Sequence, residues 1–265
     1  MTDKYEPKPL VPISTDGLED IAEALLAPFN AVNPEAGSTS LTPRKNKFRN
    51  LTISKKGKIY EVRGEFEDRG VYAIDLSEDL LSAKTQDEHA KQTEEARKTG
   101  DFGIFSIRDY QTLFDALNCL KDKTEAESAR RFIQKAFREV YPMTLTRLKY
   151  NPTGSQDNVI HDYKLQSQSS IKEDIVGADG EIRALKSQKA LTAITGEDNV
   201  QRIHEVYNWI NGTDVYLWRV NSKPNTVDER VARFFAYSDR ADLICYWYTD
   251  DRGAGLGVRV VRKKI

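Results

Sequence analysis

Two short groups of residues resemble, in type and spacing, the residues of known catalytic sites. Ser169 and Lys172 match the Ser-x-x-Lys motif of serine β-lactamases, and residues 98–100 spell their Lys-Thr-Gly motif. In those enzymes Ser-x-x-Lys comes first along the chain, and a Ser-Asp-Asn element accompanies it. Here the order is reversed and Ser-Asp-Asn is missing. We therefore interpret the match as coincidence.

The second group consists of Asp157, Asp162 and Lys164. Paired carboxylates can hold a divalent metal ion while a lysine polarises the attacking water, as nucleases do. The spacing is cramped, however, and no basic groove accompanies it. We predict ordinary turn and surface residues at these positions.

Histidines, cysteines and glycines add no further catalytic candidate. The three histidines are scattered, and Cys119 and Cys245 are far apart, which predicts neither a metal site nor a Cys-His dyad. We expect Cys119 to be a small buried residue of a helix. The G-x-G-x-G run at 253–257 precedes a strand and opens no helix, so it cradles no phosphate. The sequence predicts a protein that is not an enzyme and has no cofactor and no obligatory metal.

Charge and hydropathy exclude several classes of partner. The chain has 265 residues and a formal net charge of −1, which gives no general attraction to nucleic acid. No apolar run is long enough to span a bilayer, and the first thirty residues lack the basic start of a secretory signal. We expect no membrane insertion. The localisation stays open, with display on a virion or through a partner protein as alternatives.

The elements of the first half follow from periodicity and turn residues. Asp16 and Glu19 mark a helix start, and apolar residues then recur at helical spacing as far as Phe29. A linker rich in Pro, Ser and Thr follows. Residues 47–76 predict a small β-meander, with turns at 56–57 and 69–70. The polar segment 77–98 is expected to be either a solvated helix or a mobile excursion.

The second half alternates helices and strands. We expect helices over residues 107–120 and 124–140, the second with a Thr124–Glu127 capping box and an end at Pro142. A strand over 143–150 should be followed by a return strand over 159–166. A further helix over 200–210 should stop at Asn211-Gly212, before a strand over 215–220.

The last part of the chain changes its amino-acid usage. Lys, Glu, Gln and Met fill 49 of the first 230 positions but none of the 32 positions from Val231 to Arg262. At a background of roughly one residue in five, such a gap has a chance on the order of one in a thousand. The same stretch is rich in Phe, Tyr, Trp, Asp and Arg. It is the one compositional anomaly of the sequence.

The ending "GLGVRVVR" (Gly255 to Arg262), after an aromatic-rich polar run, resembles the C-terminus of C-type-lectin-fold proteins of the formylglycine-generating-enzyme type. It looks more narrowly like the variable proteins of diversity-generating retroelements. The resemblance covers about the last fifty-five residues. It implies an α+β C-type lectin fold with two helices and small antiparallel sheets. The expected divisions are an N-terminal helix and linker (1–46), a small β-rich region packed on or part of the main domain (47–106), and a lectin-like domain (107–265) with a variable region at about 231–256.

The codon logic of that family agrees with the composition. In such proteins adenines of a template are copied with errors, and the usual target codon is AAY. Its randomised products exclude Lys, Glu, Gln, Met and Trp. Four of these types are absent from residues 231–262, whereas Trp247 is present and must be fixed or come from another codon. The competing interpretation is a strand-and-turn region that simply prefers aromatics and Asp. We favour the variable-protein interpretation.

The resemblance implies a receptor-type protein that displays a hypervariable aromatic and polar face. Tyr and Trp offer large contact area with little rotamer entropy to lose, while Asp and Thr add adaptable polar contacts. Strand alternation predicts Leu243 and Cys245 inward, with Asp242, Ile244 and Tyr246 outward. Phe234 is expected to be buried, and Leu256, Val258 and Val260 to anchor the final strand. The expected ligand-binding residues are Phe235, Tyr237, Asp239, Asp242, Ile244, Tyr246, Trp247, Tyr248, Thr249, Asp251, Gly253 and Gly255.

The expected partner is a protein ligand or cell-surface receptor. The alternative is an enzyme, formylglycine-generating or other, that uses the same C-terminal region as a pocket with a perturbed Cys245. The chain lacks the Glu-Pro-Asn and Trp-Asn-Asp triplets of calcium-dependent lectins. Sugar binding through calcium is therefore not implied.

Overall fold

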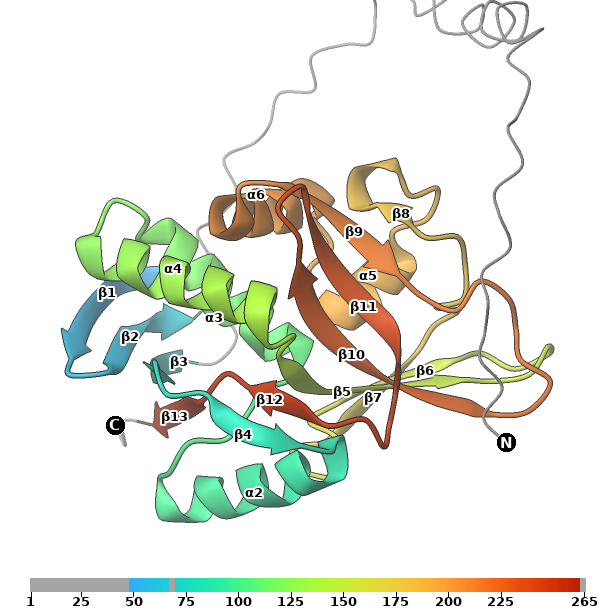
Figure 1. Cartoon of the computed structure of the whole chain (residues 1–265), viewed down its shortest axis with the longest axis horizontal. Coiled ribbons are helices and arrows are strands. Elements are labelled where there is room, and N and C mark those ends of the chain that lie inside the picture. The colour runs from blue at the N-terminus through green and yellow to red at the C-terminus, as the bar shows by residue number, and fades with distance from the viewer. Residues whose placement is uncertain (1–47, 67–69, 263–265) are drawn as a thin grey trace, which may run out of the picture. The chain divides into compact units, whose positions relative to one another are not determined.

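The computed structural model describes residues 48–66 and 70–262, which combine five α-helices with several antiparallel sheets (Figure 1). The expectation of a mixed α and β fold is confirmed at this level. The described residues group as one unit by their contacts. The helix expected before Phe29 and the linker after it lie outside the described residues. The helices are α2 (Gln86–Thr99), α3 (Ile107–Cys119), α4 (Thr124–Glu139), α5 (Lys189–Thr195) and α6 (Val200–Asn211), with a 3-10 turn η1 (Ile182–Ala184).

A four-stranded sheet contains the expected meander and the end of the chain. Its order is β1 (Phe48–Lys56), β2 (Ile59–Phe66), β3 (Gly70–Ser77) and β13 (Val258–Arg262), all antiparallel. The β1–β2 turn contains Gly57 at φ +58°, a left-handed conformation that glycine adopts without steric cost. Pairing of β13 with β3 ties residues 47–106 to the C-terminal part of the chain.

A seven-stranded sheet carries most of the C-terminal stretch near its middle (Figure 1). All neighbours are antiparallel except β9 and β11, which run parallel. The parallel pair arises because β10 and β11 form a hairpin and β11 then lies beside β9. The strand order is β7 (Ser169–Lys172), β6 (Asn158–His161), β5 (Met143–Tyr150), β10 (Asp228–Ala236), β11 (Arg240–Tyr248), β9 (Asp214–Trp218) and β8 (Gly180–Glu181).

The polar segment after residue 77 forms structure. A short strand β4 (Leu81–Lys84) pairs with β12 (Gly253–Gly255), and α2 follows with a full capping box between Thr85 and Glu88. One face of α2 is buried through small and polar side chains such as Ala90 and Thr93. The helix is therefore only half solvated, because its buried face carries few large apolar residues that periodicity could detect.

The core is built around α3 and the ring of Phe234. Phe234 stacks on Phe137 of α4 at 4.8 Å between ring centres and meets Phe114 of α3 at 5.6 Å. Tyr110 of α3 donates a hydrogen bond to the carbonyl of Leu256 at 2.7 Å. These contacts anchor β10 and the chain before β13 on the helices.

Several expectations about the helices are wrong in detail. Two helices were expected for the lectin-like domain, whereas α5 and η1 were not anticipated. The Thr124–Glu127 capping box does not form, because Lys123 is the N-cap residue without a side-chain bond and Glu127 pairs with Arg130 and Arg131. Cys119 is exposed at the end of α3. Within residues 48–66 and 70–262, no helix has the length and apolarity that crossing a bilayer requires.

Candidate binding surface

Six side chains form a continuous series of ring and guanidinium contacts across the seven-stranded sheet. From Tyr141 the rings of Phe235 and Tyr237 follow at 4.3 and 4.2 Å between centres. The guanidinium carbon of Arg240 lies 4.6 Å from the Tyr237 ring and 5.1 Å from the Trp218 ring. Trp218 stacks on Tyr216 at 6.4 Å. We call this series the aromatic ladder: Tyr141, Phe235, Tyr237, Arg240, Trp218 and Tyr216.

The sheet register positions the ladder. Phe235 pairs with Asp242 across β10 and β11, and Tyr216 pairs with Asp242 across β9 and β11, so these side chains share one face. Tyr141 reaches the same face from the turn after α4, at φ +50°. A bulky residue rarely adopts this left-handed conformation. The surrounding structure therefore fixes Tyr141 against Phe235.

Most exposed aromatic side chains belong to the variable stretch. Among the described residues, the exposed aromatic side chains are Tyr141, Tyr237, Tyr246 and Tyr248, at 38, 46, 40 and 60% of their full area. Three lie in the variable stretch and the fourth contacts Phe235. Buried aromatics fill cores, whereas clustered exposed Tyr and Trp mark interaction surfaces.

The other polar residues that were expected to bind ligand are either exposed or half-buried. Asp239 is exposed in the β10–β11 turn, and Thr249 and Asp251 are half-buried after β11. Tyr248 carries the guanidinium of Arg230 over its ring at 3.9 Å. Oδ2 of Asp228 lies 2.8 Å from Nη2 of Arg230, and this ion pair helps to hold the guanidinium over the Tyr248 ring.

The expectation that Asp242 and Ile244 are exposed is wrong. Both side chains are buried, because β11 lies between β9 and β10 and the ladder covers that face. Burial raises the pKa of Asp242, while the neighbouring guanidinium of Arg240, with Nε at 3.3 Å from Oδ2, opposes the rise. Asp242 therefore accepts a hydrogen bond that helps to hold Arg240 in the ladder.

A β-bulge interrupts the alternation of β11 after Ile244. Val231 pairs with Trp247 and Arg233 pairs with Ile244, which leaves Cys245 and Tyr246 opposite the single residue between Val231 and Arg233. The bulge places Trp247 and Ile244 on one face although they are three positions apart. Alternation in the sequence contains no sign of it.

Trp247 is half-buried and packed, which the exposed-face expectation did not anticipate. It borders a small cluster that includes Met143, Leu145 and Val231. The buried guanidinium of Arg233 lies 4.7 Å from the Trp247 ring centre. Burial lowers the pKa of Arg233 to about 10. Trp247 thus shields a buried charge.

Gly253 and Gly255 are buried where backbones approach closely. A Cβ atom at Gly255 would lie 2.3 Å from Cγ2 of Ile104, and one at Gly253 would lie 2.7 Å from Nη1 of Arg233. The carbonyl of Gly253 is 2.8 Å from Nε2 of His89. These glycines serve packing beneath the surface.

The expected anchors behave as predicted with one exception. Phe234, Leu243, Leu256 and Val258 are buried. Val260 is exposed, although it lies on the same face of β13 as the buried Val258.

The two catalytic groups considered from the sequence do not assemble. Ser169 and Lys172 are three positions apart on strand β7, an odd separation that turns them to opposite faces. Asp157 is fully buried and accepts backbone hydrogen bonds from Asn151 and Ile175, at 2.7 and 3.0 Å. Asp157 and Asp162 are thus buried rather than surface residues, each with its own separate partners.

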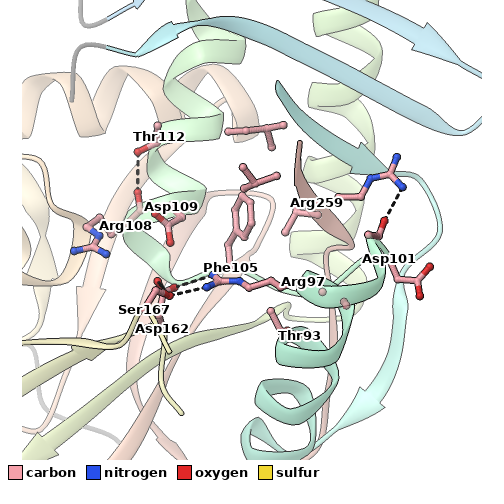
Figure 2. A pocket seen from close by; sticks show the side chains of 16 residues that line it. Thr93, Arg97, Asp101, Phe105, Arg108, Asp109, Thr112, Asp162, Ser167 and Arg259 are labelled. Atoms are coloured by element: carbon pink, nitrogen blue, oxygen red, sulfur yellow. Dashed lines mark hydrogen bonds and ion pairs between the residues drawn. The ribbon is translucent and has the colours of Figure 1, made fainter. Parts of the chain in front are cut away.

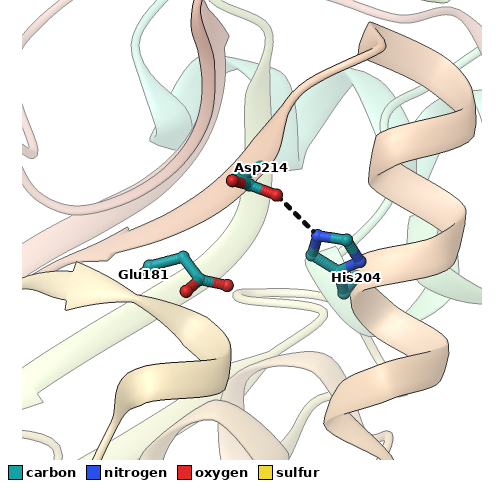
Figure 3. A group of neighbouring side chains, drawn as sticks. All are labelled: Glu181, His204 and Asp214. Atoms are coloured by element: carbon teal, nitrogen blue, oxygen red, sulfur yellow. Dashed lines mark hydrogen bonds and ion pairs between the residues drawn. The ribbon is translucent and has the colours of Figure 1, made fainter. Parts of the chain in front are cut away.

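Glu181, His204 and Asp214 bring three possible metal-ligating atoms within 4.8 Å of one another (Figure 3). Nε2 of His204 lies 2.9 Å from Oδ1 of Asp214. Arg183 pairs with both carboxylates, at 2.5 Å from Glu181 and 3.0 Å from Asp214. Arg183 therefore offsets part of the negative charge of the two carboxylates.

Comparison with protein-family models, curated proteins and solved structures found no match to this chain. The function is therefore argued from the geometry of the surface itself.

Sequence reasoning identified Phe235 and Tyr237 of the ladder but missed Tyr141, Tyr216, Trp218 and Arg240. The alternation of Tyr216 and Trp218 in "VYLWRV" was a usable signal, since both must share one face of a strand.

Proposed function

We propose that the protein is a ligand-binding protein that recognises other proteins through the aromatic ladder and the exposed tyrosines of β11, Tyr246 and Tyr248. The observation that carries the proposal is the concentration of exposed aromatic side chains at the compositionally biased stretch. The finer proposal is a variable protein of a diversity-generating retroelement with a C-type lectin fold.

The division between surface and support favours this function. Asp239, Tyr237, Tyr246 and Tyr248 project outward, whereas Phe234, Leu243 and Leu256 pack beneath them. Substitution at exposed positions costs little folding free energy, so such a surface can change without loss of the fold. Tyr and Arg are also the residue types that most often dominate protein interfaces.

The enzyme alternative requires a reactive Cys245. That side chain is fully buried, and burial raises the pKa of its thiol to about 12. Only the thiolate is nucleophilic, so this environment disfavours covalent catalysis. The binding proposal needs no such group.

A pair of matched libraries tests the proposal. One library randomises Tyr237, Asp239, Tyr246 and Tyr248, and the control library randomises the buried Phe234, Leu243, Leu256 and Val258. Protease resistance of displayed variants measures folding, and selection against an unrelated protein such as lysozyme measures binding. We expect most surface variants to fold and some to bind, while most control variants are cleaved. Equal cleavage of the two libraries, or no binders among folded surface variants, would contradict the proposal.

A further inference from the structure

A cavity lies between α2, α3 and β13 and shares no residue with the aromatic ladder (Figure 2). Its volume is about 560 Å³, within the range of small-molecule sites. Apolar side chains line one part of it, namely Ile74, Ala96, Phe105, Val258 and Val260. Charged side chains gather at the part where Arg97 reaches toward Asp162 and Ser167.

The polar end contains a buried carboxylate with an unused acceptor. Oδ2 of Asp162 accepts a hydrogen bond from Ser167 at 2.7 Å, whereas Oδ1 is buried and accepts none within the described residues. Nη2 of Arg97 lies 3.7 Å from Oδ1, an ion pair beyond hydrogen-bond distance. A buried carboxylate oxygen without a donor is costly, so a ligand that supplies one would be stabilised.

The charges around Asp162 favour a positive ligand. The carboxyl group of Asp109 lies beside that of Asp162, and both line the cavity. Arg259 is directed to Asp75, at 2.6 Å, and Arg108 donates to Ser169 at 3.3 Å. Arg97 faces the carboxyl group of Asp162 and also donates to Ser167, while Nε of Arg108, on the wall of the same cavity, is buried without an acceptor among the described residues.

The backbone at Asp162 is fixed in an uncommon conformation. Its φ is +52°, in the left-handed region that Asp adopts more readily than most residues. Residues held in this way recur at ligand sites, where surrounding structure maintains the geometry.

We propose that this cavity binds a small organic ammonium compound, whose ammonium group donates to Oδ1 of Asp162 while its apolar body packs against Phe105, Ile74 and Val258. The unused acceptor sets the position of the cation. The apolar wall sets the preference for an alkyl or aryl substituent.

Three isosteric probes test the proposal on the unmodified protein: hexylamine, hexanol and hexanoate. Backbone amide shifts of Asp162 and Ser167 in two-dimensional NMR spectra report binding. For a ligand of this size we expect a dissociation constant on the order of 1 mM for hexylamine at pH 7. Hexanol and hexanoate should bind at least about tenfold more weakly, since neither supplies a cation. Equal affinities, or no hexylamine shift up to about ten times that concentration, would overturn the proposal.

Protonation gives a second readout. Burial and the neighbouring Asp109 raise the pKa of Asp162 to about 6, against the effect of Arg97 and Ser167. His161 is neutral over the same range, because burial lowers its pKa to about 4. Hexylammonium competes with the proton on Asp162, so its affinity should be about tenfold lower at pH 5 than at pH 8. An affinity independent of pH would contradict the assigned contact.

Matched variants locate the contact. Asp162→Asn keeps the shape and removes the charge, and it should erase the preference for hexylamine over hexanol. Asp101→Asn changes an exposed carboxylate of the same cavity and should keep the preference. If Asp162→Asn keeps the preference while Asp101→Asn removes it, the ammonium group binds elsewhere and the proposal fails.

Discussion

The guanidinium carbon of Arg240 lies 5.1 Å from the ring centre of Trp218, which belongs to the neighbouring strand β9. The register of the parallel strands pairs Trp218 with Ile244, so the side chain of Arg240 reaches the Trp218 ring along the face that they share. This contact joins the aromatic pair of β9 to the aromatic residues of β10, so Arg240 makes one continuous ladder of two separate groups. Beneath it, the buried carboxylate of Asp242 accepts from Nε of Arg240.

Replacement of Arg240 by leucine should change how the unfolding free energy depends on pH, because Arg240 stabilises the ionised carboxylate of Asp242. Asp242 already has a raised pKa in the folded state, and loss of the guanidinium raises it further. The ionised carboxylate is then less tolerated, so Arg240→Leu should cost about 1 to 2 kcal/mol of unfolding free energy at pH 7. Below the pKa of Asp242 the group is neutral in both proteins, and the difference should shrink to the contribution of the lost contacts with the Tyr237 and Trp218 rings. Urea denaturation measures both values, and an equal cost at all pH values would contradict the account.

Trp247 and Tyr248 are neighbours with opposite expected roles. Trp247→Ala exposes the buried Arg233 and opens the small cluster around Met143, so it should destabilise the protein by about 2 to 4 kcal/mol. Tyr248→Ala, at an exposed position, should stay within about 0.5 kcal/mol. Urea denaturation of the two variants gives the comparison. Similar losses for both would show that Tyr248 also belongs to the core.

Gly255 should tolerate no side chain. The Cβ of alanine would meet Cγ2 of Ile104 at 2.3 Å, so Gly255→Ala should cost roughly 1 to 3 kcal/mol. Ile104→Ala removes the clashing methyl group, and the double variant should therefore lose less stability than the sum of the two single variants. Additive losses in thermal denaturation would show that Ile104 is not the obstacle.

The buried carboxyl of Asp162 should make stability fall as pH rises. Its pKa is raised from 3.8 to about 6, so the folded state binds the proton more tightly than the unfolded state. The contribution is fully present below pH 3.8 and is lost as pH rises through about 6. Asp162→Asn cannot bind this proton. The difference in unfolding free energy between the variant and the unmodified protein therefore reports the titration of Asp162, because His161 titrates in both proteins. A difference that is flat between pH 4 and pH 7 would refute the assigned environment.

Local patterns were sufficient for many elements. Lys56-Gly57 marked the β1–β2 turn, apolar spacing marked α3, and Asn211-Gly212 marked the end of α6, where Gly212 has φ +74°. These features depend on residues near one another in sequence. The bounds of α3 and α4 also agree with the expected helices over 107–120 and 124–140 to within one residue. Local patterns could not show the long-range partner of Cys119, the Arg202 guanidinium, whose Nη2 lies 3.1 Å from Sγ.

The binding surface was predictable only in part. Amino-acid usage located the stretch and suggested Phe235 and Tyr237, but it could not show the bulge at Cys245 and Tyr246 that places Trp247 on the same face as Ile244. Nor could it show that Tyr141, over ninety positions earlier, contacts Phe235. Register and bulges are decided by the packing of whole sheets, which no local pattern contains.

The DNA around the gene gives the most direct test of the proposed variable protein. We predict a near-repeat of the segment that encodes residues 231–256, differing from it mainly at adenines, beside a reverse-transcriptase gene. Codons for exposed residues such as Tyr237, Asp239 and Tyr246 should be among those that differ, and the codon for the buried Phe234 should not. A neighbourhood with no such repeat and no reverse transcriptase would contradict the proposal, and the aromatic ladder would then be a surface of fixed sequence.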